Sequence, residues 1–237
     1  MKFSKIIILP TYNEEENLKK LIEIFKRDYS DFYLLIIDDS PNDLTKKIFD
    51  QCKYENAEII KRGKKLGRGS AVRYGFEYAV KKDFSIIVEM DSDFSHDPHE
   101  LKKLVDHFMQ NNHDLVIGSR YLKESKIINW GFKRILFSKL ANFFAKVLFN
   151  FPIKDYTNGY RVYNLSLVKK IIQYKQINPD FIYLTETLII AFKNNFKCSE
   201  KPITFANRVR GKSSVNFKGI KNSFFGIIKL KINSKNI

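Results

Sequence analysis

The first half of the chain alternates short apolar runs with segments in which apolar residues recur at helical spacing. The apolar runs are rich in Ile, Val and Leu and show little polar alternation, which is typical of strands buried on both faces of a sheet. This order predicts an α/β fold of the doubly wound, Rossmann-like kind, a mostly parallel sheet flanked by helices. The predicted strands are 5–9, 33–38, 57–61, 85–90 and 114–118, and the predicted helices are 15–27, 44–54, 70–81 and 99–111.

The second half begins with a long amphipathic segment. From Gly131 to Phe151, Leu, Ile and Phe recur near helical spacing with Lys and Arg between them, and residues 224–232 have the same composition. Such a helix either packs on the sheet or lies in a membrane interface, and the pattern leaves both open. A second segment of this kind strengthens the membrane interpretation. No run of about 18 apolar residues occurs, so we expect no transmembrane helix.

Composition restricts the partners. The chain has 237 residues and 44% hydrophobic content, which excludes a disordered protein, and its 42 Lys and Arg against 26 Asp and Glu give a net charge of +16. Such a charge favours a polyanionic partner: nucleic acid, anionic lipid headgroups or a phosphorylated substrate. Cys52 and Cys198 offer neither a disulfide framework nor metal-ligand spacing, which fits a reducing, cytoplasmic compartment.

Two carboxylates spaced one residue apart follow a strongly apolar run. Asp91 and Asp93 come directly after the strand predicted at 85–90. Such a strand delivers two hard oxygen ligands to the carboxyl edge of the sheet, where α/β folds bind ligands, and this indicates a metal-assisted nucleotide site. The alternative is that an aspartate caps the helix that begins near Pro98.

Polar loops also follow the first two predicted strands. Pro10–Glu15 follows the first, and Asp38 and Asp39 end the second. Acidic groups there suit hydrogen bonds to a ribose or a base, although Thr11 or Asn13 alternatively caps the next helix. Residues 63–70 are glycine-rich but match neither phosphate-loop pattern, and we interpret them as a flexible basic turn.

Six ordered motifs together resemble a known family. They are Pro10-Thr11-Tyr12-Asn13-Glu14, Asp38-Asp39-Ser40-Pro41, Asp91-Ser92-Asp93-Phe94-Ser95-His96, Gly118-Ser119-Arg120-Tyr121, Asn158-Gly159-Tyr160-Arg161 and Arg208-x-x-Gly211-x-Ser213. The set is similar to the family-2 inverting glycosyltransferases with a GT-A fold, and most similar to the polyprenol-phosphate (dolichol-phosphate) mannosyltransferase branch. The resemblance runs from about Ile6 to Asn216. It implies a catalytic domain over residues 1–216, followed by a basic amphipathic segment over 217–237.

The resemblance also implies roles for individual residues. Pro10, Tyr12, Glu14 and Asp39 would hold the nucleoside, and Asp91, Ser92 and Asp93 the donor diphosphate. Mg²⁺ or Mn²⁺ would bind Asp91 and Asp93, with Ser95 supplying a further ligand or a water contact. Arg120, Arg134, Ser138, Arg208 and Ser213 would surround the acceptor phosphate. Asp93, Arg120 and Arg208 are the candidate catalytic residues, His96 is expected to be structural, and Glu186 matches an acidic position of open role.

One motif departs from the family pattern. After Arg208 the chain has Ser214 where the family usually has a phosphate-binding Lys, and Lys212 or Lys218 would have to substitute for it. The departure leaves the donor open and keeps an inactive family member as a further alternative.

The resemblance implies transfer of a hexose from a sugar nucleotide to a polyprenyl (dolichyl or undecaprenyl) phosphate, with inversion. GDP-mannose is favoured over a UDP-sugar. A lipid monophosphate is largely dianionic at neutral pH and needs no general base, which fits the lack of a convincing catalytic His or Glu. We expect a peripheral protein on the cytoplasmic face of a membrane, with or without a membrane-anchoring protein partner. The alternatives are a UDP-sugar transferase with another acceptor and a nucleic-acid-binding protein; no recognition motif supports the latter, so we expect no nucleic-acid partner.

Overall fold

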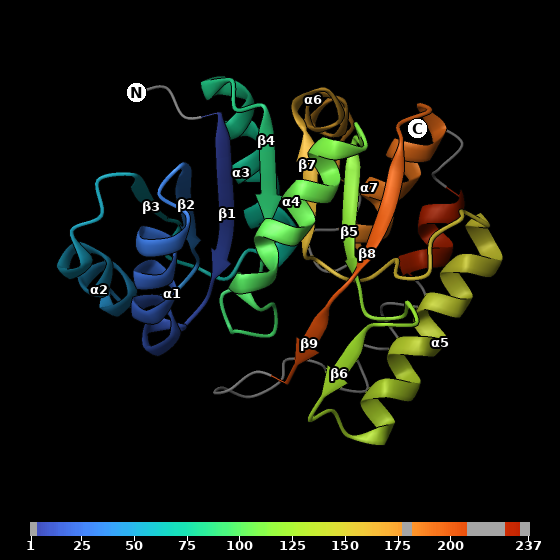
Figure 1. Ribbon diagram of the computed structural model, residues 1–237, viewed down its shortest axis with the longest axis horizontal. Coiled ribbons are helices and arrows are strands. Elements are labelled where there is room, and N and C mark those ends of the chain that lie inside the picture. Colours follow the sequence, from blue (N-terminus) through green and yellow to red (C-terminus); the bar gives the residue numbers. More distant parts are fainter. Residues whose placement is uncertain (1–3, 177–181, 208–225, 233–237) are drawn as a thin grey trace.

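A seven-stranded sheet forms the centre of the computed structural model, which describes residues 4–176, 182–207 and 226–232 (Figure 1). The strand order is β3-β2-β1-β4-β7-β5-β8. The strands are β1 (Lys5–Thr11), β2 (Phe32–Asp38), β3 (Ala57–Lys61), β4 (Ile86–Glu89), β5 (Leu115–Ser119), β7 (Arg161–Asn164) and β8 (Cys198–Pro202). A second, two-stranded parallel sheet pairs β6 (Lys126–Ile128) with β9 (Thr204–Ala206).

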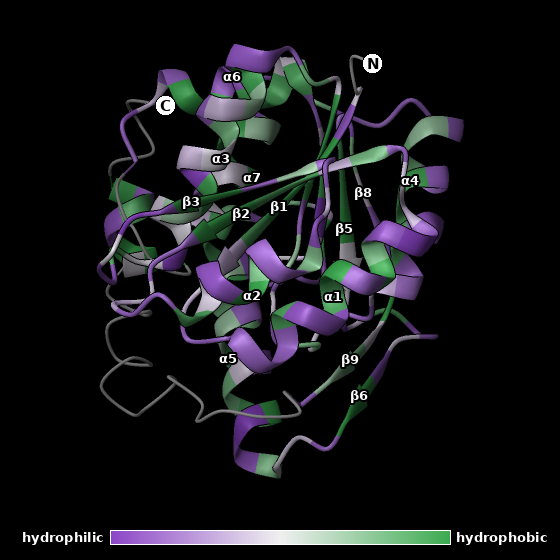
Figure 2. Cartoon of the chain, turned by 90° about the vertical axis from the view of Figure 1, so that its left-hand side faces the viewer, coloured by the Kyte–Doolittle hydropathy of each residue, from purple (hydrophilic) through white to green (hydrophobic). Residues whose placement is uncertain are grey.

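Helices cover both faces of the large sheet, and Figure 2 shows the strands as a hydrophobic layer between them. Alternate residues of β1 face opposite ways: Ile7 and Leu9 pack with α1 and α4, whereas Ile6 and Ile8 pack with α3, α6 and α7. The helices are α1 (Glu15–Asp28), α2 (Leu44–Cys52), α3 (Arg68–Lys82), α4 (Leu101–Gln110), α5 (Phe132–Phe149), α6 (Leu165–Gln173) and α7 (Tyr183–Lys193), with a 3₁₀ turn, η1 (Pro98–Glu100), before α4. The predicted architecture, a mostly parallel sheet flanked by helices, is confirmed.

One strand runs against the others. β7 is antiparallel to both β4 and β5 and lies between them. The hydrophobic pattern did not predict β7, because this four-residue strand begins with an arginine, which the fold buries fully. The Arg161 guanidinium donates instead to the carbonyls of Asn158, Tyr156 and Leu184 and to the Thr187 hydroxyl. Hydrogen bonds to every part of the guanidinium make a buried charge tolerable in this strand.

The carboxyl ends of β1, β2, β4 and β5 share one edge of the sheet. Thr11 at the end of β1 lies beside Asp38 at the end of β2, and Ile8 lies beside Glu89 at the end of β4. Because β7 is antiparallel, the loop that leads into it reaches the same edge. The strand-end motifs named above therefore gather there, with α5 and the β6–β9 pair beside them (Figure 1).

Helix α5 forms where the amphipathic pattern predicted a helix. One side packs against the protein through Ala145, Phe144 and Leu148. The opposite side exposes an apolar stripe, which we call the α5 stripe: Phe132, Leu136, Leu140, Phe143 and Val147. Residues 226–232 are also helical; Leu230 is buried while Ile228 and Ile232 are exposed. Within the described part of the chain, no helix has the length and apolarity needed to span a membrane.

Candidate active site

The loop after β4 presents Asp91 and Asp93 at the sheet edge. The Ser95 backbone N–H donates to Oδ1 of Asp93 at 3.0 Å, and the Ser92 hydroxyl donates to the Pro10 carbonyl at 3.0 Å, which ties this loop to the end of β1. The helix-capping alternative is wrong for both residues, because Asp97 caps η1 through the His99 N–H at 2.9 Å. Asp91 and Asp93 are therefore not used as caps.

His96 has a positioning role in this loop. The Asp91 N–H donates to Nδ1 of His96 at 3.0 Å, so the ring proton lies on Nε2, which donates to Oδ1 of Asn158 at 2.9 Å. The ring is fully buried and stacks on Tyr160 with centroids 4.8 Å apart. His96 thus connects the aspartate loop to the Asn158-Gly159-Tyr160-Arg161 motif, in agreement with the structural role expected of it.

Arg68, which was not predicted from the sequence, lies against Asp91 and also contacts Glu89 and Tyr183. Nε of Arg68, in the first turn of α3, donates to Oδ1 of Asp91 at 2.6 Å, and Nη1 lies 2.5 Å from Oε1 of Glu89. The Tyr183 hydroxyl contacts both Arg68 and Glu89. Burial alone would lower the pKa of Arg68, but Asp91 and Glu89 raise it above its ordinary value. The sequence did contain a sign of this buried cluster. Glu89 ends a buried strand, and a buried carboxylate requires a partner.

Gly159 makes room for this cluster. A Cβ at Gly159 would collide with the Arg68 guanidinium, whose Nη2 points to the Gly159 carbonyl at 3.4 Å. A glycine therefore lets the loop before β7 pass over the arginine. This explains on steric grounds why the Asn158-Gly159-Tyr160-Arg161 motif has a glycine at its second position.

At the end of β2, Asp39 is held by the basic loop that precedes α3. Arg62 binds both carboxylate oxygens of Asp39, at 2.6 and 2.8 Å, and the Leu66 N–H donates to it at 2.9 Å. Residues 63–70, which we expected to be a flexible basic turn, are thus anchored on Asp39 through Leu66, and from Arg68 onward they form the start of α3. Beside it, burial raises the pKa of Asp38, although hydrogen bonds from Ser40 oppose this.

The loop after β1 supplies the other predicted nucleoside residues. Tyr12 is 39% exposed, and Nζ of Lys65 lies 4.8 Å from its ring centroid. The Asn13 N–H donates to the Ser40 hydroxyl at 2.8 Å, which joins this loop to that of β2. Glu14 precedes α1 and accepts from the Asn17 side chain at 2.6 Å. The structure therefore brings Pro10, Tyr12 and Asp39 to one side of the aspartate loop, together with Lys65, which was not predicted.

Arg120, at the end of β5, forms a buried ion pair. Its Nε and Nη2 bind the two oxygens of Asp155 at 2.8 and 2.7 Å, and its backbone N–H donates to the same carboxylate at 3.0 Å. Burial would raise the pKa of Asp155, but Arg120 holds it below the ordinary value. Any contact of Arg120 with an acceptor phosphate must be made alongside this pair.

Trp130 brings two predicted acceptor residues together. The guanidinium carbons of Arg134 and Arg120 lie 4.1 and 5.6 Å from the Trp130 ring centroid. Nη1 of Arg134 donates to Asn207 at 2.7 Å. Ser138, one turn further along α5, accepts a hydrogen bond from the Tyr121 hydroxyl at 2.7 Å. Trp130 was not predicted as part of this region.

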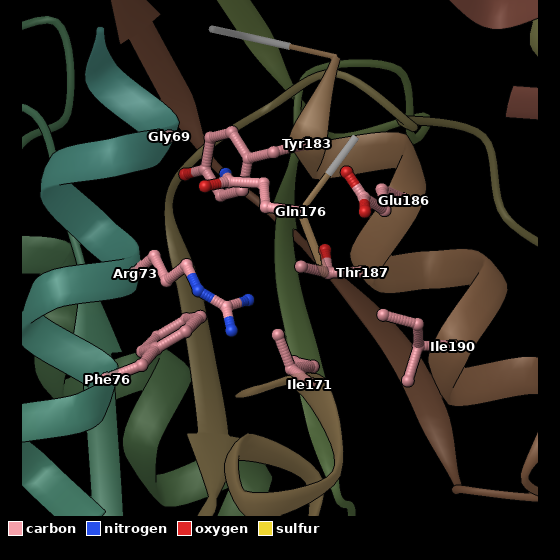
Figure 3. A pocket seen from close by; sticks show the side chains of 9 residues that line it. All are labelled: Gly69, Arg73, Phe76, Ile171, Gln176, Tyr183, Glu186, Thr187 and Ile190. Atoms are coloured by element: carbon pink, nitrogen blue, oxygen red, sulfur yellow. The ribbon is translucent and has the colours of Figure 1, made fainter. Parts of the chain in front are cut away.

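The remaining predicted residues lie elsewhere. Glu186 is buried on α7 and lines a small pocket between α3, α6 and α7, with Gly69, Arg73 and Tyr183 (Figure 3). In this pocket the Arg73 guanidinium donates to the carbonyls of Tyr174 and Ile172, at 2.9 and 2.8 Å. Arg208, Lys212, Ser213, Ser214 and Lys218 lie outside the described residues, as does the expected domain boundary after residue 216.

The donor set around Asp91 suits a metal that is only partly bound by protein. Among the residues that the structure describes, no group of three or more His, Cys, Asp or Glu side chains is placed to hold a metal ion. Magnesium is commonly bound by one or two carboxylates together with substrate phosphates and water. Asp91 and Asp93 therefore fit a cation that shares its ligands with a diphosphate.

Comparison with known proteins decides the family. The model of glycosyl transferase family 2 matches residues 6–172. The chain belongs to this family. Among curated proteins it is 31% identical to a polyprenol monophosphomannose synthase of Mycolicibacterium smegmatis over 97% of the chain and 88% of that protein. It is 33% identical to a dolichol-phosphate mannosyltransferase of Pyrococcus furiosus over 90% of the chain, and this match spans 60% of the Pyrococcus protein.

Solved structures agree on the fold. The chain superimposes on the glucosyl-3-phosphoglycerate synthase of Mycobacterium tuberculosis with a TM-score of 0.70, at 16% identity, over 99% of this chain and 80% of that one. That structure contains Mn²⁺, UDP-glucose and phosphoglyceric acid. At this identity the likeness shows the architecture alone, which agrees with the GT-A fold that the motifs implied.

Proposed function

We propose that this family 2 glycosyltransferase transfers mannose from a sugar nucleotide, preferably GDP-mannose, to a polyprenyl phosphate. The observation that carries the proposal is the match to a polyprenol monophosphomannose synthase over nearly the whole chain. The site geometry supports it, because the predicted nucleoside residues and the Asp91–Asp93 loop share one sheet edge with the Arg120–Trp130–Arg134 group.

On the donor side, the loops after β1, β2 and β4 bind different parts of the sugar nucleotide. Asp39 and Tyr12 hold the nucleoside, Ser92 fixes the aspartate loop to Pro10, and Asp91 and Asp93 hold Mg²⁺ or Mn²⁺. A divalent cation bound there supplies Lewis-acid stabilisation of the departing diphosphate. The chain keeps both carboxylates in place by hydrogen bonds from Arg68 and from the Ser95 N–H.

On the acceptor side, arginines bind a phosphate that is already ionised. The guanidinium fork matches phosphate oxygens, and Arg134 lies half-buried on Trp130 beside Arg120. A dianionic phosphate attacks the anomeric carbon directly and inverts its configuration, so no side chain has to remove a proton. Positioning and charge placement then account for the rate. Arg208 and Ser213 complete the acceptor contacts in this proposal.

In this proposal the enzyme binds the membrane that contains its acceptor, and the exposed α5 stripe supports this. Its five apolar residues recur every three or four positions and form one exposed line, flanked by exposed Lys133, Lys139 and Lys146. Ile228 and Ile232 with Lys229 and Lys231 repeat this combination on the helix at 226–232. Apolar and basic residues side by side suit an anionic bilayer surface, and we assign this surface to the cytoplasmic face.

The test is product formation by Asp93→Asn. Purified protein with Mg²⁺ or Mn²⁺, GDP-mannose and polyprenyl phosphate should give a lipid-linked sugar. We expect Asp93→Asn to lower turnover by at least about 100-fold, since it removes charge at the developing diphosphate. The matched control is Asp97→Asn in the same loop, whose side chain caps η1 and should keep turnover within a few fold of wild type. Wild-type turnover and metal dependence in Asp93→Asn would overturn the assignment.

A further inference from the structure

Arg68 has two carboxylate partners that differ in their surroundings. Glu89 is fully buried and is also bound by the hydroxyls of Tyr163 and Tyr183. Asp91 is 25% exposed and belongs to the loop that presents Asp93. The Arg68 side chain itself is 11% exposed. Glu89 is therefore a fixed anchor for the guanidinium, whereas Asp91 is a partner at the rim of the site.

Arg68 occupies one of the oxygens that a metal ion would use. Both Nε and Nη2 of Arg68 lie 2.6 Å from Oδ1 of Asp91. A monovalent cation this close opposes the binding of a second cation to the same carboxylate, and the effect is strong where water is largely excluded. A dication that binds without a nucleotide would also find only the protein ligands, which include no described cluster of three.

A donor diphosphate changes this balance. It brings anionic oxygens that complete a metal's coordination and that a guanidinium also binds well. With a donor bound, Arg68 would be free to bind a phosphate oxygen in place of Asp91 while Glu89 and Tyr183 retain the guanidinium.

We propose that Arg68 is a built-in counter-cation of Asp91, which keeps the metal affinity of the nucleotide-free enzyme low and makes metal and donor diphosphate bind as a pair. This inference rests on the proposed function, since it assumes that Asp91 and Asp93 bind metal with a nucleotide. Arg68 is a positioning residue in this scheme, and its effect appears in binding before any turnover occurs.

Mn²⁺ titration monitored by electron paramagnetic resonance tests it, with and without GDP or UDP. For wild type we expect nucleotide to strengthen Mn²⁺ binding by at least about fivefold, with an equal effect of Mn²⁺ on nucleotide affinity. In Arg68→Gln, Mn²⁺ binding without nucleotide should tighten by about fivefold or more, so the ratio between the two conditions falls toward one. The matched control is Arg62→Gln, which removes an equal charge from the Asp39 pair and should leave nucleotide-free Mn²⁺ affinity unchanged.

If Arg68→Gln folds poorly, a second pair of variants tests the same role of Arg68. Arg68→Gln with Glu89→Gln removes both partners of the buried pair, which proteins tolerate better than the loss of one. This double variant should bind Mn²⁺ more tightly than Glu89→Gln alone. Unchanged or weaker nucleotide-free Mn²⁺ binding in these variants overturns the role of Arg68 and leaves the proposed function standing. If neither nucleotide strengthens Mn²⁺ binding to wild type, the proposed function fails and the inference fails with it.

Discussion

Individual charged residues at this sheet edge are held by partners far away in the chain. Arg62 pairs with Asp39, Arg68 with Asp91 and Arg120 with Asp155, and all three arginines are largely buried. The Arg62–Asp39 and Arg120–Asp155 pairs each fix a carboxylate and a guanidinium in one orientation before any substrate binds. Such fixed dipoles and charges do not have to reorganise during a reaction, which is a general source of catalytic power.

The buried Arg120–Asp155 pair is expected to contribute strongly to the stability of the fold. Asp155→Asn leaves a buried guanidinium without its charge partner and should lower the free energy of unfolding by about 3–5 kcal/mol. Urea unfolding at neutral pH measures this, with Asp50→Asn as the control, because the Lys46–Asp50 pair is exposed and should leave the midpoint unchanged. Equal effects of both variants would contradict a structural role for the buried pair.

The same pair has a pH signature. Because Arg120 holds the pKa of Asp155 below its ordinary value of 3.8, the stabilisation is fully present above that value. It is lost as pH falls through the lowered pKa of the folded state. Asp155→Asn has no carboxylate to protonate at this position. Its free energy of unfolding should therefore fall less than that of the wild type as the pH is lowered below about 4, measured by urea unfolding at each pH.

Among the helices, α5 has one side packed against the protein and an apolar row exposed on another side. The sequence pattern left open whether this helix packs on the sheet or lies on a membrane, and the structure shows one side packed and the other exposed. A packed row and a separate exposed apolar row fit on one helix because it has 18 residues. A monomeric soluble protein rarely exposes a continuous apolar patch without a binding role.

The α5 stripe predicts binding to anionic vesicles. Phe143, which is 66% exposed, can be replaced by Glu with little effect on folding, but the change opposes insertion into an anionic interface. Full burial of a Phe side chain is worth about 1.5–3 kcal/mol, so we expect binding to phosphatidylglycerol vesicles to fall by at least about tenfold. Sedimentation with vesicles measures this. Met109→Glu on α4 is the control, since Met109 is 44% exposed and lies outside the stripe; equal losses would exclude α5 as the contact surface.

The whole molecule combines an α/β core, packed on both faces of the sheet, with one edge where the predicted site residues gather. Both hydrophobic layers extend along the sheet, so the strand ends are held in register while their loops carry the charged residues. Ligands of open α/β sheets bind beyond the carboxyl ends of the strands, which is where the Asp39, Asp91 and Arg120 pairs lie. Ligand binding at this edge should therefore stabilise the molecule as a unit.

Thermal unfolding with nucleotides tests this at the scale of the molecule. A nucleoside diphosphate with Mn²⁺, present at about 100 times its dissociation constant, should add about 2.7 kcal/mol of stability. For a domain of this size that raises Tm by about 5–10 °C. We expect GDP to give the larger shift and UDP the smaller one, with adenine and cytosine nucleotides as controls. A larger shift with UDP would replace GDP-mannose by a UDP-sugar as the donor.

The sequence by itself determined the order of strands and helices along β1 to β5 and the polar loops at their ends, because hydrophobic periodicity and strand-end polarity are local properties of the chain. It also marked Asp39, Asp91 and Asp93 as candidate ligands. Only the tertiary structure decided that β7 enters antiparallel between β4 and β5, and that Arg62, Arg68 and Asp155 are the partners of the predicted residues. These pairs join positions 23 to 35 residues apart. Their contacts depend on how helices and loops return to one sheet edge, which no local pattern records.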